Sequence, residues 1–172
     1  MSDYEFTLTF SLPEAEGDPE QYLDALYEAG CDDALIGTGQ AGSITLDFVR
    51  DAESATVALE SAIENVKAAI PGAELIEAKP DLVGLTDVAK ILDCSRQNIR
   101  KYMDTHLDFP KPVHTGIASL WHLSDLATFY KFNIPQSIVE LSKMTFKVNL
   151  DIQQHHYQKM IEDDDQNHKL AM

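Results

Sequence analysis

The side chains of greatest chemical interest in this 172-residue chain are basic and amide groups crowded into one short stretch. They are Arg96, Gln97, Asn98, Arg100 and Lys101. An arginine guanidinium can form two hydrogen bonds to a guanine edge, an asparagine or glutamine amide can pair with adenine, and lysine can bind phosphate. On one helix this combination is typical of DNA recognition, and the alternative interpretation is a solvated charged surface.

Two short helices joined by a tight turn are predicted to position these groups. Thr86 can cap the first helix, and Ser95 can cap the second, which carries the basic side chains. Ala89 is small enough for close helix packing, Asp93 falls at the turn, and Ile99 falls at a core position. Glycine is usual at such a turn because the chain becomes left-handed there, and aspartate tolerates that conformation. The spacing therefore predicts a helix-turn-helix.

A hairpin and a third helix are predicted to follow. Residues 109–123 read FPKPVHTGIASLWHL, in which Thr115-Gly116 forms a turn and the prolines favour an edge strand. Ser124 can cap the third helix. A helix pair, then a hairpin, then a helix is the order of a winged helix-turn-helix.

At residues 82–132 the chain resembles the MerR-like and excisionase-like (AlpA-like) winged helix-turn-helix proteins, through the segments LTDVAKILDCSRQNIRKY, FPKPV and SLWHLSDL. The resemblance implies binding to double-stranded DNA, with a recognition helix over 95–104 in a major groove and the wing near the backbone or minor groove. It also implies dimerisation through a helix after this domain. The side chains expected to contact DNA are Thr86, Ser95, Arg96, Gln97, Asn98, Arg100, Lys101, Lys111, His114 and Thr115.

The first 79 residues are predicted to form a separate small domain. Apolar and polar side chains alternate strictly between Tyr4 and Leu12, which predicts a strand with one buried face. Asp18 followed by proline is typical of a helix start, and apolar residues recur with helical spacing from Leu59 to Ile70. The expected order, strand-helix-strand-strand-helix-strand, resembles the ferredoxin-like sandwich.

No catalytic, metal or cofactor site is expected. Gly37, Gly39 and Gly42 match the spacing of a dinucleotide-binding loop, but a strand instead of a helix is predicted after them, which favours a turn. Cys31 and Cys94 lack metal-site spacing and predict reduced thiols. No nucleophile, base and orienting group come together, so the chain is not expected to be an enzyme.

The net charge of −16 is distributed unevenly. Residues 1–79 carry 17 acids and 3 bases, whereas residues 80–134 carry 6 of each. This balance excludes a generally basic nucleic-acid coat and a membrane protein held by charge. The acidic domain is expected to face away from phosphates and to bind a protein partner or a small effector. With neither a membrane-spanning run nor a secretory signal, the protein is expected to be cytoplasmic.

A C-terminal helix over residues 134–162 is predicted to mediate a homodimer. Its apolar residues recur at steps of three and four, which approximates a heptad seam. The seam residues are Ile134, Ile138, Leu141, Val148 and Ile152. The alternative is a helix that packs back on its own domain, and residues 163–172 are predicted to be disordered.

The sequence as a whole predicts an α+β protein. An acidic ferredoxin-like domain over 1–79 precedes a winged helix-turn-helix over 80–133, the dimerisation helix and the tail. The expected function is a dimeric, sequence-specific transcriptional regulator from a bacterium or phage. The alternatives are an antitoxin-like or phage-related inhibitor whose acidic domain binds a protein, and a recombination directionality factor.

Overall fold

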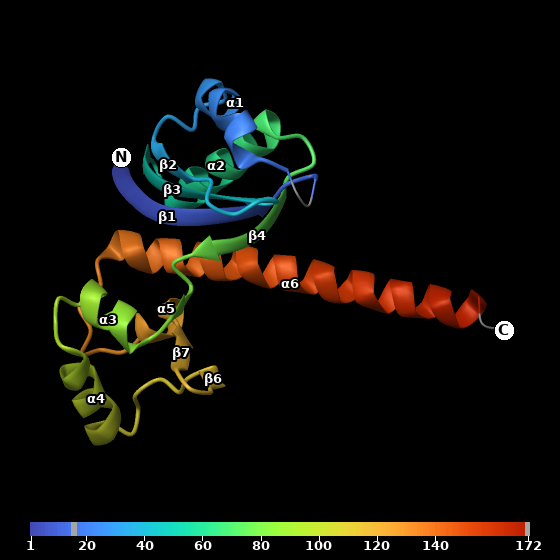
Figure 1. Cartoon of the computed structure of the whole chain (residues 1–172). Helices are drawn as coiled ribbons and strands as arrows, with labels where there is room; N and C mark the ends of the chain where they lie inside the picture. The colour runs from blue at the N-terminus through green and yellow to red at the C-terminus, as the bar shows by residue number, and fades with distance from the viewer. Residues whose placement is uncertain (15–16, 171–172) are drawn as a thin grey trace.

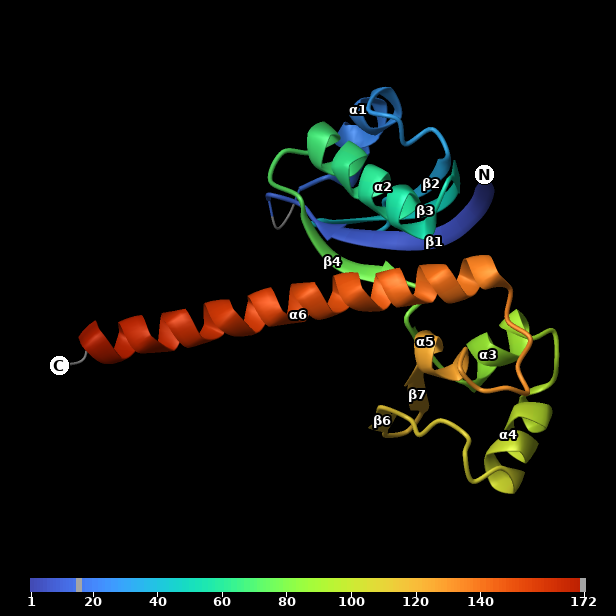
Figure 2. The same cartoon turned by 180° about the vertical axis from the view of Figure 1, so that it is seen from behind.

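The computed structural model describes residues 1–14 and 17–170. These residues form an α+β fold with a four-stranded antiparallel sheet, a small second sheet and a long C-terminal helix (Figures 1 and 2). Among the described residues, no helix combines the length and the apolar character needed to cross a bilayer.

The first sheet has the strand order β2-β3-β1-β4, with every neighbouring pair antiparallel. Its elements are β1 (Ser2–Ser11), η1 (Pro19–Tyr22), α1 (Leu23–Glu28), β2 (Ala34–Gly37), β3 (Ser43–Ala52), α2 (Ala55–Ala69) and β4 (Glu74–Lys79). The predicted order of strands and helices is confirmed. A strand begins directly after Gly42, whose φ is 75°, so the glycine-rich segment is a turn between β2 and β3 as predicted.

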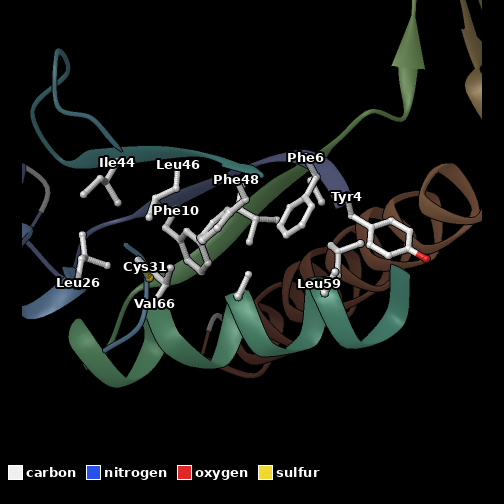
Figure 3. Close-up of a cluster of buried hydrophobic side chains, with 14 of the residues drawn as sticks. Tyr4, Phe6, Phe10, Leu26, Cys31, Ile44, Leu46, Phe48, Leu59 and Val66 are labelled. Carbon is white, nitrogen blue, oxygen red and sulfur yellow. The ribbon is translucent and has the colours of Figure 1, made fainter. Parts of the chain in front are cut away.

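One face of this sheet is apolar and is covered by α1 and α2 (Figure 3). The alternation of β1 places Phe6 and Phe10 on this face, and the ring of Phe6 stacks on Phe48 with centroids 5.1 Å apart. Cys31 lies in the same core, where burial raises the pKa of its thiol to about 11. The opposite face is polar, and on it Thr7 Oγ1 donates to Asp47 Oδ1 at 2.6 Å.

The second sheet has the order β5-β7-β6 and belongs to a smaller unit built around Trp121. Its elements are β5 (Leu82–Val83), α3 (Leu85–Ile91), α4 (Arg96–Thr105), β6 (His114–Thr115), β7 (Ser119–His122) and α5 (Leu123–Leu126). The buried Trp121 donates from Nε1 to the carbonyl of Pro110 at 2.9 Å. This bond fixes the segment that enters the hairpin.

Two predicted helix caps in this unit are wrong. Thr86 is exposed and does not cap α3, because the helix already begins at Leu85 and Gly84 is its N-cap. The Gly84 N–H donates instead to Asp87 Oδ2 at 3.0 Å. Ser124 does not cap α5 either, since α5 begins at Leu123 and is only 4 residues long. In both places the strand leads directly into the helix.

The C-terminal helix α6 (Gln136–Leu170) is longer than predicted. Its first part lies alongside β4, and the rest projects away from the body of the molecule (Figures 1 and 2). Residues 163–170, for which a disordered tail is predicted, are helical in the structure, and 171–172 lie outside the described residues. The tail is polar, but it contains good helix formers, and a helix already nucleated at residue 136 can propagate through it.

The free edge of β4 is closed by a side chain of α6. Asn149 accepts from the Ala78 N–H and donates to the Ala78 carbonyl, each at 2.8 Å, so its amide substitutes for a neighbouring strand. Asn149 Nδ2 also donates to Asp81 Oδ2 at 2.7 Å, and the other Asp81 oxygen lies 2.6 Å from His122 Nδ1. The buried Asp81 carboxylate therefore joins the sheet edge, α6 and the smaller unit.

Replacing Asn149 with leucine is expected to destabilise the protein by about 3 kcal/mol or more, because buried backbone groups and the Asp81 carboxylate lose their partner. Urea unfolding measures the change in the free energy of unfolding. Gln153→Leu is the matched control, since Gln153 is exposed on the same helix and its replacement should cost less than about 0.5 kcal/mol. Equal stabilities for the two variants would contradict this account of the sheet edge.

Candidate nucleic-acid interface

The turn between α3 and α4 has the predicted left-handed backbone. Asp93 is the residue of positive φ in this turn, at 48°. The next N–H, from Cys94, donates to the Ala89 carbonyl at 2.9 Å. Ser95 then caps α4 as predicted, with its Oγ accepting from the Asn98 N–H at 3.2 Å. These bonds fix the direction in which α4 leaves α3.

Helix α4 has an apolar inner face and a polar outer face. Ile99 is buried in the core of the smaller unit, where Tyr102 and Met103 also pack. The five basic and amide side chains of the sequence prediction are all exposed. Their exposure follows from helical spacing, because Ile99 alone among residues 96–101 points at the core.

Two shallow hollows flank the outer face of α4. The first runs along the helix and is lined by Ser95, Gln97, Asn98, Arg100, Lys101, Asp104 and Thr105. The second lies between α4 and the hairpin of β6 and β7. Its α4 side includes Arg96 and Arg100, its hairpin side includes Ile117 and Ala118, and Thr86 also lines it. The two arginines therefore line the hollow beside the hairpin, and Arg100 lines both hollows, whereas Gln97 and Asn98 line only the first.

The structure separates the predicted wing contacts from the rest of the site. Lys111, His114 and Thr115 are exposed, but they line neither hollow. Ile117, which lines the hairpin side of the second hollow, is not among the residues predicted from the sequence. An apolar residue directly after a Thr-Gly turn was the available signal.

The acidic sheet and α4 lie on opposite sides of α6 (Figures 1 and 2). The carboxylates of Asp87 and Asp104 line the hollow beside the wing, so the local surface is mixed in sign. The excess acid of residues 1–79 is separated from α4 by the first part of α6. At physiological salt, exposed charges farther apart than about 8 Å are largely screened from one another.

Most of the predicted dimer seam packs within the chain. Ile134 and Ile138 lie against the core of the smaller unit, whereas Leu141 and Val148 lie against the core of the first sheet. Ile152 is half-buried. The first part of α6 thus follows the alternative interpretation, in which the helix packs on its own chain.

No family model matches the chain, and no match was found among curated proteins or solved structures. Function is therefore inferred from the geometry of α4 and the neighbouring hairpin.

Replacing Asp93 with valine is expected to lower the free energy of unfolding by about 1–2 kcal/mol, because a β-branched residue is strained at positive φ. Asp93→Gly should be neutral or stabilising, since glycine adopts this conformation without strain. Thermal unfolding of both variants measures the difference. Asp108→Val in the exposed loop after α4 serves as the control, and a similar loss there would argue against a strained turn at position 93.

Proposed function

We propose that the protein is a sequence-specific DNA-binding transcriptional regulator that acts as a dimer. The observation that carries the proposal is the single outward face of α4, which presents all five basic and amide side chains while Ile99 anchors the opposite face. A hairpin stands beside this face, as a winged helix-turn-helix requires. On this proposal the smaller unit belongs with the MerR-like and excisionase-like proteins. The strand order β2-β3-β1-β4 supports a ferredoxin-like sandwich in the N-terminal domain.

In the proposed complex, α4 enters the major groove. Gln97 and Asn98 lie in its first turn, where residues of a recognition helix meet base edges. Arg96 and Arg100 line the hollow beside the hairpin together with Asp87 and Asp104, and on this proposal the two guanidinium groups hold one phosphate backbone there. A guanidinium can alternatively bind a guanine edge. Lys101, on the outer face, adds a phosphate contact.

The proposed dimer uses the projecting part of α6, because the earlier apolar residues already pack within the chain. Leu150, Tyr157 and Ile161 are exposed there, at steps of seven and four that place them on one helix face. A second copy would bury this face. Two copies related by a two-fold axis would read a palindromic site.

A second candidate function is a protein-binding inhibitor, favoured by the polar face of the first sheet. Exposed apolar side chains stand there beside acids: Leu35 pairs with Asp47 across β2 and β3, and Val49 pairs with Glu5 across β3 and β1. A basic protein partner would fit this surface. On this function Val49→Glu should abolish capture of such a partner, while Val57→Glu on the exposed side of α2 should retain it.

Binding of the full chain to fragmented genomic DNA, followed by sequencing, tests the main proposal. The wild type is expected to enrich a shared site at fixed, near-physiological salt. Arg96→Ala and Arg100→Ala should each weaken binding by roughly 5- to 150-fold if each residue reads a base, which corresponds to about 1–3 kcal/mol.

The matched control is the double variant Lys67→Ala/Lys147→Ala, which removes the same charge from exposed positions on α2 and α6. It should retain the enriched site, whereas Arg96→Ala/Arg100→Ala should lose it. Absence of any enriched site with the wild type would overturn the proposal. If both double variants lose the same amount of DNA affinity, the binding depends on net charge and not on the face of α4.

A further inference from the structure

The hairpin beside α4 carries an isoleucine at its tip that none of the residues described by the structure covers. Ile117 is fully exposed, at 113% of its reference area. A single exposed apolar residue is common on protein surfaces and means little alone. Here the position of Ile117 is informative, because it lies at the end of a hairpin and lines the same hollow as the arginines of the proposed recognition helix.

The hairpin turn is tight and directs the side chain of Ile117 outward. Thr115 pairs with Ser119, so the loop contains only residues 116–118. The imidazole of His114 occupies the space that a Cβ at Gly116 would need. The side chains of the loop are therefore limited to positions 117 and 118, and the larger of them is the isoleucine.

The hollow between α4 and the wing relates Ile117 to a DNA duplex. Arg96 and Arg100 line one side of this hollow, and Ile117 and Ala118 line the other. With α4 in a major groove, the hollow receives the phosphate backbone that borders that groove. The minor groove lies on the far side of this backbone, and on the proposed docking the hairpin tip, which lines the other side of the hollow, lies next to it.

We infer that Ile117 is a minor-groove wedge that inserts at a base step and partly unstacks it. Apolar side chains such as isoleucine insert between base steps in this way, and Ile117 has no polar group with which to read base edges. Pyrimidine–purine steps unstack most easily, so a TA or CA step is expected beneath the wing, outside the bases that α4 contacts. The inference rests on the proposed DNA-binding function.

Fluorescence of 2-aminopurine tests the wedge directly, because this base brightens when it is unstacked. Duplexes that carry the enriched site, with 2-aminopurine placed at successive positions, are titrated with the full chain. The wild type should raise the fluorescence at one step outside the bases read by α4. Ile117→Ser should lose most of this rise, and Ile117→Leu should keep it.

Leu107→Ser is the matched control, since Leu107 is equally exposed, at 105%, but lies in the loop after α4 and lines neither hollow. It should leave the fluorescence rise unchanged. If the wild type binds the duplex without such a rise, or Ile117→Ser keeps it in full, the wedge is wrong and the proposed function stands. If the wild type binds no duplex, both are overturned.

Discussion

The structure depends on how the open edge of its main sheet is covered. β4 is an edge strand, and the unpaired backbone groups of its buried residue, Ala78, need partners. A single side chain, Asn149 on α6, supplies both an acceptor and a donor to Ala78. The same amide binds Asp81, whose other oxygen lies against His122 of the smaller unit. The position of the smaller unit therefore follows from the way in which the edge of β4 is closed.

This arrangement also separates the charges of the molecule. The first part of α6 lies between the acidic sheet and the smaller unit, so α4 is presented away from the excess negative charge. A strongly acidic protein can bind DNA under these conditions, because the local surface and not the net charge determines phosphate contact, and distant exposed charges are screened by salt. As a consequence, the early apolar residues of α6 pack into the two cores of the chain and are not free to form a dimer seam.

Local patterns predicted the elements well, although the two helix caps at Thr86 and Ser124 were wrong, and long-range contacts explain why the predicted dimer seam packs within the chain. Three features depend only on neighbouring residues, and the structure confirms them: the alternation of β1, the left-handed Asp93 and the Ser95 cap. The pairing of Asn149 with Ala78 spans 71 positions and leaves no local trace, so the apolar residues of α6 resembled a free dimer seam. For the candidate site, the sequence predicted that the basic and amide side chains share one helix, and the structure shows that they are exposed on α4. The sequence could not show which side chains share a hollow with Ile117, because that depends on how the hairpin packs beside the helix.

In the proposed complex α4 and the hairpin contact DNA, and the acidic sheet does not. Hydrogen–deuterium exchange of the full chain, with and without a duplex that carries an enriched site, distinguishes the two surfaces. We expect slower exchange in α4 and in the hairpin of β6 and β7, with β1, β3 and β2 unchanged. Protection confined to the sheet, with α4 unaffected, would contradict the proposed complex.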